Sequence, residues 1–177
     1  MLARTFVLAA ALVAPTAICA QDAATTFREL LIQYRCPVAD CLERIYEAIG
    51  SSDPQNLFLI IYFADRSNDY VQCVFDTPTR MLCEASSGFY DNIPTEPRSR
   101  RLSASAIAAL SRLGFSTDDS AGNFQVWFDV ANPPDFNKIA DFTLKALHDV
   151  YDARAGVTLK FNAPLAPRAT SKCVPVS

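Results

Sequence analysis

Three apolar runs, joined by very short connections, constrain the fold of this 177-residue chain. They are "LFLIIYFA" (57–64), "YVQCVFD" (70–76) and "MLCEASS" (81–87), and each has the length and composition of a buried or half-buried strand. Parallel neighbours would need helical crossovers, for which these connections are far too short. The runs therefore predict an antiparallel sheet and exclude a doubly wound parallel one.

Helical patterns lie on both sides of these strands. From Phe27 to Ile49, apolar residues recur at intervals of three and four, although Pro37 is expected to interrupt or restart that helix. "SASAIAALSRLG" (103–114) predicts a second helix that starts at a serine cap and stops at Gly114. "PDFNKIADFTLKALHDVYD" (134–152) predicts a third, and "NFQVWFDV" (123–130) a strand before it.

The expected order is thus helix, three strands, helix, strand, helix. This order is typical of the α+β class, with an antiparallel sheet flanked by helices (α-β-β-β-α-β-α). The length suits one domain over residues 21–177, ending in a Pro-rich tail from about residue 162.

The N-terminus has the pattern of a secretory signal peptide. Arg4 precedes an apolar run over residues 6–13, and small residues lead to an expected cleavage after Ala20. Lipidation at Cys19 is disfavoured because Ile18 stands where a small residue is needed. No other apolar run is long enough to span a bilayer, so we expect a periplasmic or secreted protein without a stable membrane anchor.

The charge pattern argues against nucleic acid as a partner. The formal net charge is -3, and the one basic cluster, "RSRR" from Arg98 to Arg101, is expected to be a solvated loop.

Candidates for catalysis are few. The single histidine, His148, is expected on the wet face of the third helix, and Glu84 at a strand end is expected to bond to the backbone. The aromatic side chains of Phe124, Trp127, Phe128 and Phe136 fit a core better than a ligand site. We expect no enzyme activity, no metal site and no cofactor.

Five cysteines remain after the expected cleavage. If residues 77–79 form a three-residue hairpin loop, Cys73 lies directly opposite Cys83, at a spacing that a disulfide tolerates. A two-residue loop would instead put these sulfurs on opposite faces, and pairing with the distant cysteines stays open. Cys36 and Cys41 can bond only if Cys36 lies outside the helix, and Cys173 is the expected free thiol.

Several short motifs resemble a known family. They are "YVQ" (70–72), "EASSGFY" (84–90), "LSRLGF" (110–115), "GNF" (122–124) and "ALHDVYD" (146–152). Together they are similar to the motifs of TY-Chap (Tir-chaperone-like) domains, which are related to YbjN-type bacterial proteins and to type III secretion chaperones. The resemblance runs from about Phe27 to Phe161. It implies a helix-flanked antiparallel sheet, often dimeric, that binds other polypeptides and performs no chemistry.

Two classes of function follow from the sequence. The first is a secreted, chaperone-like module that binds a protein or peptide and exists as a monomer or a homodimer. The alternative is a small periplasmic thiol-redox protein or enzyme that uses Cys36 or Cys41 near a helix start, although no base stands nearby in the sequence to activate the thiol.

Overall fold

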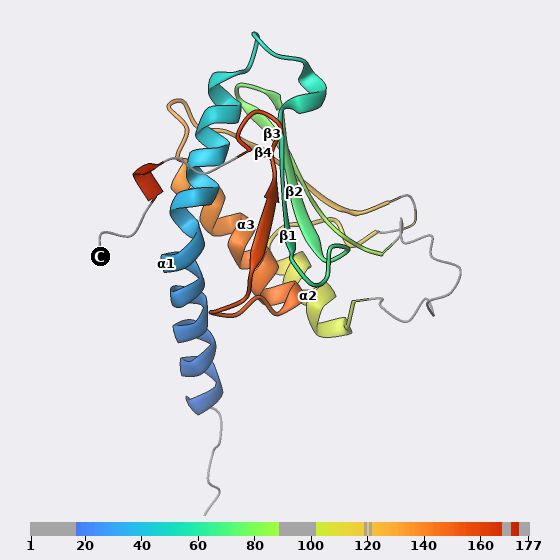
Figure 1. The fold of residues 1–177 in the computed structure, drawn as a ribbon. Coiled ribbons are helices and arrows are strands. Elements are labelled where there is room, and N and C mark those ends of the chain that lie inside the picture. The colour runs from blue at the N-terminus through green and yellow to red at the C-terminus, as the bar shows by residue number, and fades with distance from the viewer. Residues whose placement is uncertain (1–16, 89–101, 119, 121, 168–170, 174–177) are drawn as a thin grey trace, which may run out of the picture.

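The computed structural model describes residues 17–88, 102–118, 120, 122–167 and 171–173, and it leaves the side chains of residues 17–25 undescribed. Most of the expected signal peptide and the cluster from Arg98 to Arg101 lie outside these ranges. The helices are α1 (Ala17–Glu47), α2 (Ala104–Arg112) and α3 (Phe136–Tyr151), with short 3-10 turns η1 (Pro54–Asn56) and η2 (Ser171–Cys173). The strands are β1 (Phe58–Phe63), β2 (Tyr70–Thr77), β3 (Arg80–Ala85), β4 (Phe124–Asp129) and β5 (Leu159–Asn162) (Figure 1).

The strands form one antiparallel sheet in the order β4-β3-β2-β1-β5. The α+β class and the expected order of elements are therefore confirmed, with β5 as an additional strand. "VTLKFN" (157–162) does alternate apolar and polar residues, but β5 is only four residues long. So short a strand is stable here because it pairs with β1 along its whole length.

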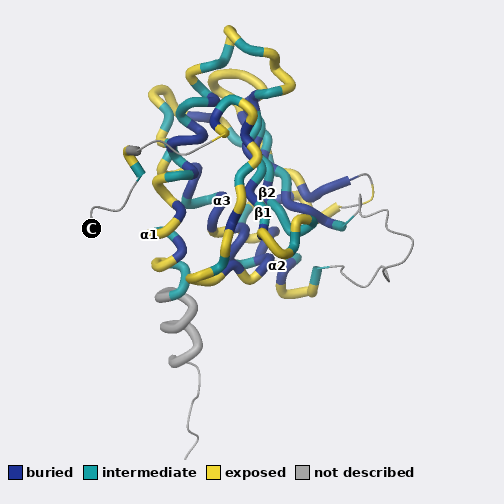
Figure 2. Tube along the Cα trace, in the orientation of Figure 1, coloured by how far each residue is buried: buried dark blue, intermediate teal, exposed yellow. Residues whose placement is uncertain are grey.

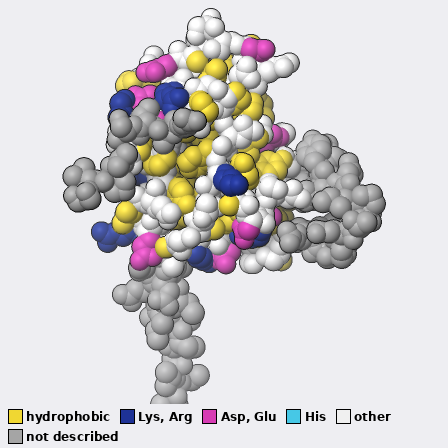
Figure 3. All heavy atoms as spheres, viewed as in Figure 1, with side chains coloured by type: hydrophobic (Ala, Val, Ile, Leu, Met, Phe, Trp, Pro, Cys, Tyr) yellow, Lys and Arg dark blue, Asp and Glu magenta, His cyan; other side chains and the backbone are white. Residues whose placement is uncertain are grey.

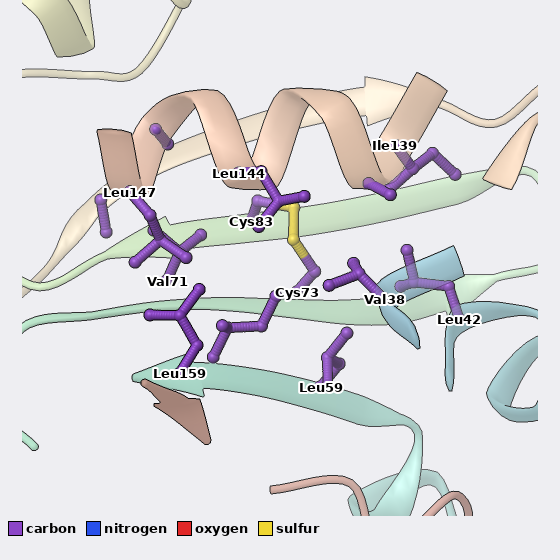
Figure 4. Packing of buried hydrophobic residues seen from close by; sticks show 14 of the residues in the cluster. Val38, Leu42, Leu59, Val71, Cys73, Cys83, Ile139, Leu144, Leu147 and Leu159 are labelled. Atoms are coloured by element: carbon purple, nitrogen blue, oxygen red, sulfur yellow. A yellow bond between two sulfur atoms is a disulfide. The ribbon is translucent and has the colours of Figure 1, made fainter. Parts of the chain in front are cut away.

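The β2–β3 hairpin reaches the expected register by a different route. Thr77 pairs with Arg80, so the turn itself holds two residues, and a bulge between Phe75 and Thr77 shifts the register back. Cys73 consequently faces Cys83, and the two form a disulfide with their Cα atoms 4.1 Å apart. Both cysteines point into the core, where Figure 4 shows them beneath α3.

The core lies between one face of the sheet and the layer of α1 and α3. Alternate residues of β1, β2 and β3 are fully or almost fully buried on this face, as are Leu144 and Leu147 of α3 and Val38 and Leu42 of α1 (Figure 4). α2 packs against α3. The side of α1 that faces the core is buried and its outer side is exposed (Figure 2).

α1 runs without interruption through Pro37, contrary to the expectation from the sequence. The residues before and after this proline, Tyr34, Val38 and Leu42, all lie in the same buried stripe. A proline inside a helix costs free energy, but the continuous packing of this stripe against α3 and the sheet keeps the helix in one piece.

The continuity of α1 also changes the pairing of the cysteines. Residues five apart in a helix are separated by about 8 Å, too far for a disulfide, so the Cys36–Cys41 pair, which required Cys36 to lie outside the helix, does not form. Cys36 instead bonds to Cys173, which was expected to be free, with a Cα separation of 5.4 Å. Among the described cysteines, the free one is Cys41, and it is buried.

The outer surface mixes apolar and polar side chains. In the view of Figure 3, hydrophobic side chains lie over the middle of the molecule and most charged ones lie near its periphery. None of the described helices is both long enough and apolar enough to cross a membrane.

Tyr34 connects α1 to the last strand and yields a test of the fold. Its hydroxyl donates to the carbonyl of Val157 at 2.6 Å and accepts from the N–H of Leu159 at 3.1 Å. Tyr34→Phe removes both of these bonds, as well as the one that the hydroxyl accepts from the Gln33 amide at 3.1 Å, and it leaves the buried N–H of Leu159 without this partner. We expect the free energy of unfolding to fall by about 1–3 kcal/mol in urea denaturation.

Tyr62→Phe is the matched control for this change. Within the described residues, the Tyr62 hydroxyl forms no hydrogen bond, and the ring lies on the opposite face of the sheet. Equal destabilisation by both substitutions would contradict the connecting role of Tyr34.

Candidate functional site

The second face of the sheet is the first candidate surface, because α1, α2 and α3 all pack on the other face. Across four strands, Phe58, Val74, Leu82 and Trp127 stand directly opposite one another, and we call these four side chains the apolar row. Trp127 is 45% exposed, and the other three are partly exposed. Polar pairs border the row, such as Glu84, which accepts a hydrogen bond from the Gln125 amide at 2.9 Å.

The edge strand β4 presents backbone groups that point away from the sheet. Val130 N–H donates to Thr79 O at 2.8 Å, so the even-numbered residues of β4 pair with β3. The N–H and C=O groups of Gln125, Trp127 and Asp129 therefore face outward. Ser116 N–H already bonds to the outward carbonyl of Gln125 at 2.7 Å, whereas the outward groups of Trp127 have no partner among the described residues.

A cavity of about 300 Å³ lies beside this edge, on the helix side of the sheet. Its volume is within the range of sites that hold small ligands or single large side chains. Val126 and Phe128 of β4 form one wall, since they point to the same side as the buried Cys83 and Met81. The other lining residues come from the end of α2, the segment after β4 and the first half of α3: Leu113, Asp129, Val130, Ala131, Asp135, Lys138, Ile139 and Phe142.

Local sequence signals hold the walls of the cavity in place. The Asp135 carboxylate caps α3 by accepting the N–H of Lys138 at 3.0 Å. The Ser103 hydroxyl caps α2 in the same way, and Gly114, at a φ of 87°, ends the turn after it. Phe142 stacks on Phe115 and meets Phe128 edge to face. These contacts pack the apolar wall together, while Asp129, Ala131 and Lys138 remain at the surface.

Trp127 belongs both to the β4 edge and to the second face of the sheet, which we call the open face. Its indole stands at the end of the apolar row, and the Arg80 guanidinium lies over the ring at 4.2 Å. Its outward backbone groups belong to the β4 edge. A chain that paired with Trp127 would therefore contact the apolar row on one side and the cavity on the other.

His148 is not the surface residue that helical spacing predicted. It is 5% exposed and lies between α1 and α3, with its ring 5.2 Å from that of Phe27. Nδ1 lies 2.7 Å from Asp149 Oδ1, and Nε2 lies 2.6 Å from Arg154 Nη1 and 3.3 Å from the Thr26 hydroxyl. The prediction was wrong because it considered only the polar residues that neighbour His148 on α3. It did not account for the residues of α1 that cover this position.

The surroundings of Asp149 favour the charged form of its carboxyl group. Burial raises the pKa of the carboxyl, but hydrogen bonds from His148 and Lys145 outweigh burial and hold the pKa below its usual value. The carboxylate therefore contributes stability above its unfolded-state pKa, and this contribution is lost as the pH falls through the lower folded-state pKa.

The remaining residues singled out in the sequence do not converge on one site. Glu84 bonds to a side chain on the open face and not to the backbone, whereas His148 lies on the other side of the sheet. Phe124 is in the core, and Phe136 packs on Tyr46. Burial raises the pKa of the Cys41 thiol to about 11, so this thiol is protonated at neutral pH.

The edge and the cavity were not identified from the sequence. "NFQVWFDV" did carry a signal, because Trp127 is a large apolar residue on the face of the strand that is otherwise polar. That pattern cannot by itself reveal that β4 is at an edge, since edge position depends on how distant strands are ordered.

The buried position of His148 gives the test for this subsection. His148→Ala removes the ring that fills the space against Phe27 and leaves the Asp149 carboxylate without one of its partners. We expect a loss of about 2–3 kcal/mol in the free energy of unfolding, measured by chemical denaturation. Asn137→Ala, on an exposed position of the same helix, is the control, and an equally mild effect of both changes would argue against the buried cluster.

The fold and the edge can be compared with known proteins. Neither the curated proteins nor the solved structures give a match. A family model does match, over residues 36–164, and the family is described as "T3SS (YopN, CesT) and YbjN peptide-binding chaperone 3". The matched range contains all five strands, α2, α3 and the later part of α1. Because it also covers well over half of the sequence, the chain belongs to this family of chaperone-like, peptide-binding domains, TY-Chap3.

Proposed function

We propose that the protein is a secreted, non-enzymatic module that binds an extended segment of another polypeptide along β4. The family supports a polypeptide as the partner. Two neighbouring features carry the proposal: the strand edge at Trp127, with which no described residue pairs, and the cavity directly beside it. An added strand would form backbone hydrogen bonds with the outward groups of Trp127 and Asp129, the mode of binding known as strand addition.

The geometry also specifies which side chains of the bound segment matter. Side chains of an added strand alternate between the two faces of the sheet. Residues opposite Val126 and Phe128 would enter the cavity, so an apolar side chain is favoured there. The residue opposite Trp127 would lie on the open face beside the indole, where an aromatic or aliphatic side chain extends the apolar row.

The alternative, a thiol-redox enzyme using Cys36 or Cys41, has less support. Cys36 is bonded to Cys173, and the Cys41 thiol is buried with a raised pKa. A reactive thiol needs the opposite environment, partly exposed and close to positive charge or to a base.

The experiment uses the single tryptophan of the chain as its reporter. Peptides of alternating apolar and polar residues, without tryptophan, are titrated while the fluorescence of Trp127 is followed. We expect saturable binding. Methylation of the peptide nitrogens that face β4 should abolish it, and methylation of the alternate nitrogens should have little effect, because only the first set donates to the edge. Equal effects of both sets would contradict strand addition.

Filling the cavity is the test on the protein side. Ala131→Phe places a ring at the exposed rim of the cavity, where it competes with the side chain of the peptide. We expect binding to weaken by about tenfold or more, the equivalent of losing most of one buried apolar side chain. Ala108→Phe, at an exposed position of α2 that does not line the cavity, is the control and should bind normally.

We also propose that the mature protein begins at Gln21. The support is the sequence pattern, in which Arg4 and an apolar run over residues 6–13 are followed by small residues up to Ala20. Intact mass of the exported protein should correspond to residues 21–177. A mass that includes Cys19 with acyl chains would contradict this cleavage.

A further inference from the structure

The β4 edge can accept an added strand over a short stretch only. The outward carbonyl of Gln125 already accepts the N–H of Ser116 at 2.7 Å, so Ser116 occupies the position that an added strand would need there. The outward groups of Trp127 and Asp129 have no such neighbour among the described residues. A segment that pairs with this edge therefore lies beside Trp127 and Asp129 and leaves β4 before Gln125.

The existing sheet favours one direction for the added strand. Every pair of neighbouring strands is antiparallel, and antiparallel pairing lets a single residue exchange both backbone bonds with Trp127. In that direction the residue beside Asp129 comes first, the residue beside Phe128 second and the residue beside Trp127 third. The second side chain points to the cavity, and the first and third lie on the open face.

The Asp129 side chain places a charge on the open face at this edge. It is exposed and has no ion pair or hydrogen bond with any described residue. Arg80 stands directly opposite on β3, but its guanidinium lies over the Trp127 ring at 4.2 Å and 3.9 Å from the Asp76 carboxylate. The Asp129 carboxylate is therefore available to a side chain that arrives on its other side.

The other charges near the edge do not compete for that side chain. Asp135 and Lys138 line the cavity on the helix side of the sheet, and they carry opposite charges. Arg80 is two strand spacings, or about 10 Å, from the position of an added residue. Directly opposed residues on neighbouring strands have their Cβ atoms only about 5 Å apart, so Asp129 dominates the field at this position.

We propose that Asp129 selects a basic side chain in the bound segment. The recognised sequence is then a basic residue, an apolar residue and an aromatic or aliphatic residue, in that order. The basic group pairs with the Asp129 carboxylate, the apolar side chain fills the cavity, and the third side chain lies beside the Trp127 indole. This inference rests on the proposed binding along β4 and adds which segments are bound. The formal net charge of -3 also favours the approach of a basic segment.

Peptides that differ at one position test this selection on the full protein. Three tryptophan-free peptides carry lysine, glutamine or glutamate two positions before a phenylalanine, and the fluorescence of Trp127 reports binding. We expect the lysine peptide to bind about threefold or more tightly than the glutamine peptide, and the glutamate peptide to bind most weakly. High salt should reduce these differences, because the pair is exposed. Equal or tighter binding of the reversed triplet would overturn the assigned order.

Variants of the protein locate the charge that is responsible. Asp129→Asn should still bind the lysine and glutamine peptides but with equal affinity, and Asp129→Lys should prefer the glutamate peptide. Asp65→Asn, which neutralises an exposed carboxylate in the turn after β1, is the control and should keep the preference for lysine.

The outcomes separate this inference from the proposed function. Binding of all three peptides to the wild-type protein with equal affinity would overturn the role of Asp129 and leave strand addition standing. A preference for lysine that persists in Asp129→Asn would have the same meaning. Failure of every peptide to bind would overturn both proposals.

Discussion

The register between β2 and β3 decides which side chains of the sheet enter the core and which remain outside. A slip of one residue would move Cys73, Val71 and Phe75 to the open face and bring Gln72 and Val74 into contact with α3. The bulge near Asp76 and the Cys73–Cys83 bond both oppose such a slip. In the chain-entropy description, closing this short loop contributes roughly 2–3 kcal/mol.

Given that register, the rest of the architecture follows from one-sided burial. α1 and α3 pack together over the buried face and cannot cover the other. The sheet therefore keeps an apolar row outside, and it keeps two edges. At β5 the Tyr34 hydroxyl binds the edge N–H of Leu159, whereas at β4 the groups of Trp127 remain unpaired among the described residues. An unpaired strand edge can pair with other chains and cause aggregation. Binding a peptide strand is one way in which a protein uses such an edge.

Local patterns in the sequence predicted most of the fold. Strand runs, a serine cap on α2 and the periodicity of α3 are properties of neighbouring residues, and the structure has all of them, with Ser103 as the cap. The errors concern interactions between distant segments. Pro37 stays helical because of packing against α3, His148 is covered by Phe27, and Cys36 reaches Cys173 only because the tail returns to α1. The cavity beside β4 is also built from separate segments, and no local pattern indicates it.

Amide hydrogen exchange of Trp127, followed by nuclear magnetic resonance with and without a bound peptide, tests the proposed binding edge most directly. The Trp127 N–H points outward and has no partner in the described part of the chain. Strand addition predicts that its exchange slows strongly in the complex, because the peptide carbonyl accepts this N–H. Peptide binding that leaves the exchange of Trp127 unchanged would contradict the account and direct attention to the apolar row on the open face.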